Sequence, residues 1–307
     1  MPVSKPRKKE PSKGAKGARK SSIPSLPDPR VIEGMMASLV GSPAADEALD
    51  HAQEVIYDAW DAATPKQRVE LAAKALAISP LCADAYVLLG EHAEPGSPEQ
   101  LECYRRGVAA GEAALGEAAF IEDAGHFWGL LETRPYMRAR LGLAQLLWGR
   151  GERDEALAHF RDMLRLNPND NQGVRYLLAA RLLEVGRDAE LVTLLGNYKE
   201  DDSAAWDYTK ALAAFRRVGD NAESRRLLAE AIAENRHVPA YLLRRRKMPK
   251  TMPAFMSPGE EDEAICYMSE GGAAWSSTPG ALDWLRERQE VDAAPGQRGR
   301  RGSSGRA

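Results

Sequence analysis

The chain has 307 residues, 44% of them hydrophobic, and a formal net charge of −3. This apolar content is enough for a sizeable core, and the excess of Ala and Leu over β-branched and aromatic residues favours helices. The sequence lacks an uninterrupted apolar stretch of about 18 residues, as a membrane-spanning helix requires, and no apolar segment follows the basic N-terminus as in a secretory signal. We therefore predict an all-α, cytoplasmic protein without a membrane partner.

Charge is distributed unevenly along the chain. Residues 1–30 contain nine Lys and Arg against two acids, and residues 293–307 contain four Arg and no acid, which leaves −14 for the residues between them. Both ends are poor in large apolar side chains, so they cannot offset the entropy lost on ordering. We predict a disordered basic arm over residues 1–30 and a disordered Arg/Gly-rich tail over residues 289–307.

Between these ends, helical periodicity recurs in blocks of similar length, which is typical of repeat proteins. We predict N-terminal helices over residues 31–65 and helical repeats over residues 66–240. Residues 71–80 have the pattern of the second helix of a unit. Residues 85–90 begin the next unit, whose second helix carries Tyr104.

The clearest unit is a helical hairpin over residues 137–170. Apolar side chains at helical spacing define its two facing helices: Leu143, Ala144, Leu147, Ala156, Phe160 and Met163. Residues 149–152 form a polar turn between the helices, and Pro168 ends the second one. The two alanines allow a close approach of the helices, and Phe160 fills the space beside them.

The same pattern continues towards the C-terminus. Two further hairpins turn at residues 185–188 and at residues 219–220. Residues 241–288 contain Trp275 and Trp284, and we predict that they form a helical cap over the open end of the stack. The acidic run at residues 259–263 precedes a helix, where negative charge favours the helix dipole.

The hairpin over residues 137–170 resembles a tetratricopeptide repeat, and the other units are degenerate versions of it. A wider resemblance covers residues 66–288. The segments ALAISPLCADAYVLLGE, RRGVAAGEA, YMRARLGLAQLLWGRGERDEALAHFRDML, AIAENRHVPAYLL and EDEAICYMSEGGAAWSSTPGALDWL are similar to the suppressor of tumorigenicity 7 family. These resemblances imply a tetratricopeptide-like helical-repeat solenoid with a concave groove. The vertebrate family members carry N-terminal membrane segments where this chain has its basic arm, so the resemblance implies a soluble relative.

By the tetratricopeptide pattern, Leu141 and five polar or aromatic side chains face the concave groove: Arg138, Gln145, Trp148, Gln172 and Arg175. Arg and Trp are common at energetic centres of interfaces, and a guanidinium can bind a carboxylate through two hydrogen bonds. An acidic peptide or a protein C-terminus is thus a compatible ligand. The dicarboxylate clamp of chaperone-binding repeats is not reproduced, because Leu141 stands where that clamp has Lys.

The segment from His126 to Arg138 is the densest in chemically versatile side chains. His126 and Glu132 could act as a general acid and base, but no nucleophile, oxyanion donor or metal site accompanies them. The simpler interpretation is an ordered entry into the following helix. In that case Pro135 lies in the first helical turn, and Arg134 and Arg138 pair with acids.

Motifs for a metal or a cofactor are lacking in the sequence. The five His show no HExxH or HxxxH spacing, no glycine-rich phosphate-binding loop occurs, and the residues from Asn167 to Gly173 have the character of a helix cap. Cys82, Cys103 and Cys266 are odd in number and scattered, which indicates buried thiols in a reducing compartment. We predict no cofactor and no metal.

These observations favour a non-enzymatic scaffold that binds a protein or peptide partner in its groove. One alternative is a nucleic-acid-associated protein that uses its basic arms, whose contacts would weaken steeply with salt. A simpler role for the arms is solubility. The remaining alternative is an enzyme with a site between His126 and Arg138.

Overall fold

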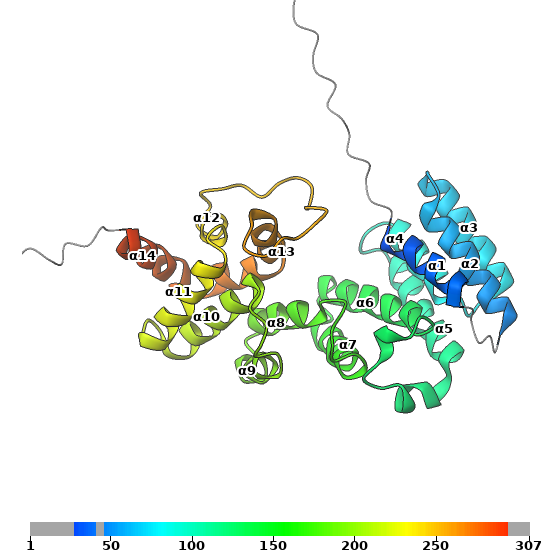
Figure 1. Cartoon of the computed structure of the whole chain (residues 1–307), viewed down its shortest axis with the longest axis horizontal. Helices are drawn as coiled ribbons and strands as arrows, with labels where there is room; N and C mark the ends of the chain where they lie inside the picture. The colour runs from blue at the N-terminus through cyan, green and yellow to red at the C-terminus, as the bar shows by residue number, and fades with distance from the viewer. Residues whose placement is uncertain (1–27, 41–45, 294–307) are drawn as a thin grey trace, which may run out of the picture.

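The computed structural model describes residues 28–40 and 46–293, and helices account for its regular secondary structure throughout these ranges. The basic arm predicted for residues 1–30 and the tail predicted for residues 289–307 fall largely outside the described residues. Residues 29–30 and 289–293, which we predicted to be disordered, are helical. The helices form an elongated array with α1 to α5 at one end and α10 to α14 at the other (Figure 1). The prediction of an all-α fold is confirmed.

Ten helices form five antiparallel pairs in chain order, each joined by a short turn. Their bounds are α2 (Glu47–Asp61) with α3 (Pro65–Ile78), α4 (Ala83–His92) with α5 (Pro98–Glu122), α6 (Arg134–Gly149) with α7 (Arg153–Leu166), α8 (Val174–Glu184) with α9 (Asp188–Asn197), and α10 (Ala204–Val218) with α11 (Ala222–Glu234). Consecutive pairs also contact one another, α4 with α6 and α8 with α10. Each pair therefore buries its apolar face partly against its neighbour, as in a repeat stack.

The remaining helices flank this stack. They are α1 (Pro29–Val40) before it, the 3-10 helix η1 (Phe127–Gly129) between α5 and α6, and α12 (Val238–Leu242), α13 (Glu261–Ser277) and α14 (Ala281–Ala293) after it. The domain boundary that we placed at 65/66 falls in the first turn of α3, the second helix of the first pair.

The predicted hairpin over residues 137–170 is confirmed in detail. It corresponds to α6 and α7, with a turn at residues 150–152, and Ala144, Ala156 and Phe160 are completely buried. The predicted turns at 185–188 and 219–220 also separate paired helices, and Tyr104 lies on α5 as expected. Helical periodicity was sufficient here, because each hairpin is specified by contacts that are local in sequence.

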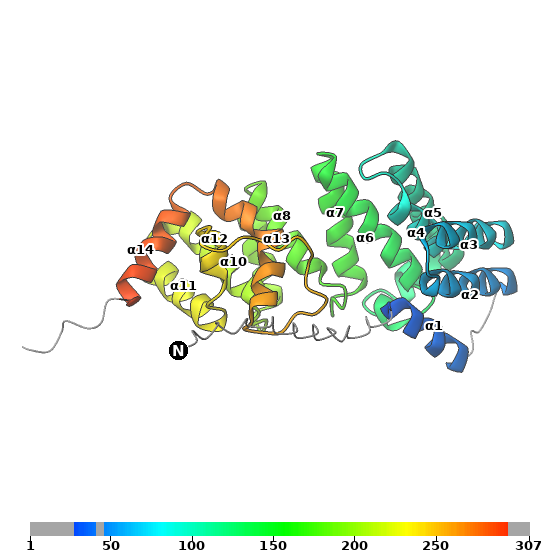
Figure 2. The ribbon, with the colours of Figure 1, turned by 90° about the horizontal axis from the view of Figure 1, so that it is seen from above.

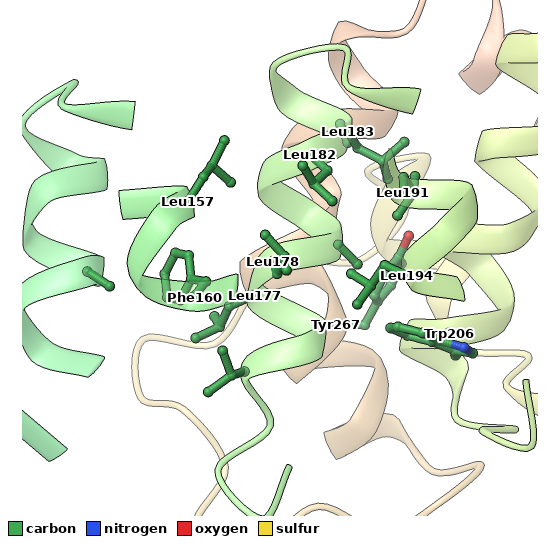
Figure 3. Packing of buried hydrophobic residues seen from close by; sticks show 14 of the residues in the cluster. Leu157, Phe160, Leu177, Leu178, Leu182, Leu183, Leu191, Leu194, Trp206 and Tyr267 are labelled. Atoms are coloured by element: carbon green, nitrogen blue, oxygen red, sulfur yellow. The ribbon is translucent and has the colours of Figure 1, made fainter. Parts of the chain in front are cut away.

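Two clusters of buried apolar side chains support the array. One lies among α2, α3 and α4, and the larger one runs from α4 to α14. Figure 3 shows part of the larger cluster, where Phe160 of α7 lies beside Leu177 of α8, and Leu183 lies beside Leu191 of α9. The core is thus extended along the stack, as expected for units that complete each other's packing.

The C-terminal helices α13 and α14 pack against different parts of the stack. Stacking of Trp284 on Phe215, at 4.5 Å between ring centroids, places α14 against the end of α10. Instead of covering that end, α13 packs along α8 and α10. Its buried Glu263, in the predicted acidic run, accepts the Ala204 N–H at 3.0 Å. That carboxylate therefore joins α13 to α10, a tertiary contact beyond the dipole effect that we predicted.

The Tyr104 ring packs between two glycines of neighbouring helices. A Cβ atom on Gly142 of α6 would lie 2.3 Å from Tyr104 Cε1, and one on Gly90 of α4 would lie 3.0 Å from Cζ. The absence of a side chain at Gly142 is therefore what allows α4, α5 and α6 to meet.

We predict that Gly142→Ala destabilises the protein by about 1–3 kcal/mol, because the added methyl group overpacks a buried ring. Gly149→Ala is the matched control in the same helix, since nothing lies within 4 Å of its Cβ position, and it should be neutral or slightly stabilising. Urea denaturation measures both. Equal effects of the two substitutions would contradict the packing account.

Candidate functional site

The first helices of the five pairs, α2, α4, α6, α8 and α10, provide the surface on which we expected a ligand, and we call it the first-helix surface. Arg138 of α6 lies at its N-terminal half. The guanidinium donates to Asp84 Oδ1 of α4 at 2.8 Å and to the two carboxylate oxygens of Glu33 of α1 at 3.0 and 3.2 Å. Its carbon Cζ lies 5.3 Å from the ring centroid of Trp60 of α2.

This cluster is almost completely removed from solvent. The side chains of Asp84, Glu33 and Arg138 are 0%, 7% and 10% exposed. Burial alone would lower the pKa of Arg138, but the two carboxylates raise it above its ordinary value. The guanidinium therefore remains charged, and its hydrogen-bonding capacity is directed at groups within the chain.

Two more arginines attach α1 to the same surface. Arg134 of α6 donates to Glu33 Oε2 at 3.0 Å. Arg30 of α1 donates to Glu91 of α4 at 2.7 Å, and its Cζ lies 4.6 Å from the Trp60 ring centroid. The helix α1 is thus held across α2, α4 and α6 by charged side chains of both signs, and Figure 2 shows it beside α2.

The other predicted arginine, Arg175 of α8, is also engaged within the chain. Its Nε donates to Asp201 at 2.7 Å, and Nη1 donates to Asp170 at 3.1 Å. The guanidinium carbon lies 4.3 Å and 5.2 Å from the ring centroids of Tyr176 and Tyr198. Asp170 also accepts the Val174 and Arg175 N–H groups, so the predicted cap at the start of α8 is confirmed.

The remaining candidates differ in accessibility. Gln145 is exposed, Trp148 is half-buried, and Gln172 is half-buried with its Oε1 atom enclosed and without a hydrogen-bond partner. The Trp148 ring lies 5.4 Å from Arg153 Cζ and 5.2 Å from Arg181 Cζ. Arg181 also donates to Glu270 of α13 at 2.7 Å. Gln145 and Trp148 therefore lie on α6 between the parts of the surface contacted by α1 and by α13.

The segment from His126 to Arg138 forms the ordered entry into α6 that we predicted. Pro135 lies in the first turn of α6, Phe127 packs against Phe120 and Tyr136, and Arg134 Nε donates to the Trp128 carbonyl at 2.9 Å. The pairing of Arg134 and Arg138 with acids is confirmed. His126 and Glu132 are exposed, and no hydrogen bond between them occurs in the described segment.

Sequence reasoning missed the partners of Arg138. The sequence analysis did not single out Asp84, and Glu33 lay in a segment that we predicted only to be helical. Asp84 also raises the pKa of the neighbouring Cys82 thiol, after the larger effect of burial, to about 12. Cys82 is the buried thiol that we predicted, whereas Cys103 and Cys266 are half-buried, and all three are free.

Within residues 28–40 and 46–293, no group of three or more His, Cys, Asp or Glu side chains is arranged to hold a metal ion. Over the same ranges, no helix combines the length and the apolar character needed to cross a membrane.

A second polar cluster surrounds Arg140 of α6. Its guanidinium donates to Tyr136 Oη at 2.6 Å and to His159 Nδ1 at 3.1 Å, and it pairs with Asp162. A hollow of about 350 Å³ lies beside Tyr136, Arg140 and Asp162. Burial and the adjacent Arg140 lower the pKa of His159 to about 4, against a smaller opposite effect of Asp162.

The fold and this surface define an all-helical protein of stacked antiparallel helix pairs whose first helices carry buried ionic clusters. A protein-family model described as ST7 protein matches residues 43–291, and the chain belongs to this family. The predicted family resemblance is therefore confirmed.

Curated relatives agree with this assignment. The chain is 29% identical to the protein ST7 homolog of Caenorhabditis elegans over 280 residues, which cover 76% of this chain and 49% of that relative. It is 26% identical to the suppressor of tumorigenicity 7 protein of Macaca fascicularis over 280 residues, which cover 76% of this chain and 52% of the relative. The chain spans about half the length of the curated relatives that it matches.

We predict that Arg138→Leu destabilises the protein by about 3–5 kcal/mol, because it leaves the Asp84 carboxylate buried without its cation and leaves Glu33 paired with Arg134 alone. Arg106→Leu is the control: its side chain is 64% exposed and forms an ion pair with Glu102 on the same helix, so the expected change is within about 0.5 kcal/mol. Urea denaturation compares the two. A difference below about 1 kcal/mol would contradict a structural role for the Arg138 cluster.

A second prediction concerns pH. Because the folded-state pKa of His159 lies near 4, below the unfolded value of about 6.5, its contribution to stability is present above pH 6.5 and is lost as the pH falls towards 4. His159→Gln should flatten the dependence of unfolding free energy on pH in this window, and NMR should give an imidazole titration midpoint near 4. An unchanged slope together with a midpoint near 6.5 would refute the prediction.

Proposed function

We propose that this chain is a non-enzymatic, tetratricopeptide-like scaffold that binds a protein or peptide partner along its first-helix surface. The supporting observation is the stretch of α6 between α1 and α13, where Gln145 is exposed and Trp148 is half-buried. A half-buried indole flanked by two arginines combines the residue types that most often dominate binding energy at interfaces. The extended stack provides the length of surface that a polypeptide ligand requires.

The location of α1 supports the same proposal. Its attachment to α2, α4 and α6 shows that a helix fits across three first helices, with a carboxylate held by Arg134 and Arg138. The expected preference for an acidic ligand is consistent with this arrangement, although the acid that occupies the arginines belongs to the chain itself. To bind the carboxylate of a ligand, Arg138 or Arg175 would first have to release the carboxylates of this chain with which it is paired.

A cytoplasmic location is part of the proposal. It rests on three cysteines without disulfide bonds, which favour a reducing compartment. Binding of nucleic acid would depend on the basic ends of the chain, which lie mostly outside the described residues, and no side-chain arrangement on the first-helix surface favours it over a protein partner.

Site-specific cross-linking tests the proposal. A photoreactive amino acid at Gln145 should give discrete adducts with proteins of a cell extract, whereas the same group at Arg226 of α11, whose side chain is 61% exposed, should not. When Trp148→Ala is added to the chain that carries the photoreactive group at position 145, the adduct yield should fall by about tenfold, because an anchoring aromatic residue is lost. Equal adducts at Gln145 and Arg226, or no effect of Trp148→Ala, would contradict binding at this surface.

A further inference from the structure

The contacts of α1 differ from those of a helix committed to the core. Its buried, well-partnered side chain is the charged Glu33, whereas the apolar Ile32 and Met36 are 48% and 49% exposed. Helices in a core normally bury their apolar side chains and expose their charges. Val31 packs against the apolar cluster of α2, α3 and α4, and Gly34 lies close to the Tyr57 ring. The most deeply buried side chain described on α1 is nevertheless a carboxylate held by charge-assisted hydrogen bonds.

We call the surface of α2, α4 and α6 that contacts α1 its seat, and this seat is also incompletely filled. A hollow of about 460 Å³ remains between α1 and the stack, lined by Ile32 and Met36 on one side and by Trp128, Arg134 and Arg138 on the other. Side chains that line an unfilled space lose dispersion contacts they would make in a packed core. A helix with a larger apolar side chain at the position of Met36 would fill this space better than α1 does.

The three recognition points of α1 are spaced by one helical turn. Arg30 reaches Glu91 and the Trp60 ring, Glu33 reaches Arg134 and Arg138, and Met36 lies beside the hollow. Residues three apart on a helix lie on one face, so a single face presents a cation, a carboxylate and an apolar group in that order. On the stack, Glu91 faces the cation, Arg134 and Arg138 face the carboxylate, and the Trp128 indole lines the hollow beside the apolar group.

We propose that α1 is the resident occupant of a helix-docking site, and that the site binds in exchange a partner helix carrying a basic residue, an acid three positions later and a large apolar residue three positions after that. This inference rests on the proposed scaffold function and names the chemistry of its partner. Because α1 is part of the same chain, its effective concentration is high, and an outside helix binds only in the fraction of time that the seat is vacant. Weakening α1 therefore strengthens binding in trans.

The experiment uses the full chain and a fluorescent peptide with the sequence of residues 28–40, read by anisotropy. The peptide should bind the Glu33→Gln chain at least about tenfold more tightly than the unaltered chain, since the altered α1 vacates the seat. A peptide that carries Glu33→Gln should lose this binding, and one that carries Met36→Trp should bind more tightly than the parent peptide. Arg30→Ala in the chain is a second way to loosen α1, and it replaces neither Arg138 nor any of its hydrogen-bond partners.

Two results would overturn the inference. One is equal affinity of the parent peptide for the unaltered, Glu33→Gln and Arg30→Ala chains, including no binding to any of them. The other is equal binding of the parent and Glu33→Gln peptides. If either occurred while the Gln145 adducts persisted, only the assignment of the α1 seat would fail. Loss of those adducts, by contrast, would refute the scaffold function itself.

Discussion

One buried guanidinium, that of Arg138 on α6, connects its own helix to three helices from the N-terminal part of the chain. Arg138 contacts Asp84 of α4, Glu33 of α1 and the ring of Trp60 of α2, and its hydrogen bond to Glu33 spans 105 residues of the chain. A buried cation with two carboxylates is costly to desolvate, so each member depends on the others for compensation. This mutual dependence fixes how α1 and the first two helix pairs lie on α6.

The same interaction determines which part of the first-helix surface is accessible. The chain's own α1 and α13 contact the two halves of this surface, and the stretch with Gln145 and Trp148 lies between them. The molecule thus combines an apolar core along the stack with a first-helix surface on which ion pairs between side chains hold α1 and α13. Partner binding at the middle stretch uses accessible groups, whereas binding at the α1 seat requires exchange.

The sequence predicted the helix pairs well because their determinants are local. The spacing of Ala144, Ala156 and Phe160, and the glycine-rich turns, identify a hairpin without knowledge of the rest of the chain. The state of Arg138 and Arg175 could not be predicted in the same way. The repeat pattern predicted that Arg138 faces the groove, but it could not identify Glu33 as a partner, because Glu33 lies on a helix outside the repeats. Its position against α6 depends on tertiary packing. We predicted that residues 241–288 cap the end of the stack, but α13 packs along α8 and α10. This position also depends on tertiary packing.

The account depends most on the ionic attachment of α1, and amide hydrogen exchange measures it directly. In the Glu33→Gln chain, amides of residues 29–40 should exchange much faster than in the unaltered chain, while protection in α7 and α10 remains the same, since local opening needs no unfolding of the stack. Unchanged protection of residues 29–40 would show that the Glu33 contacts do not hold α1. Loss of protection throughout the chain would show that α1 is part of the core and not an exchangeable occupant.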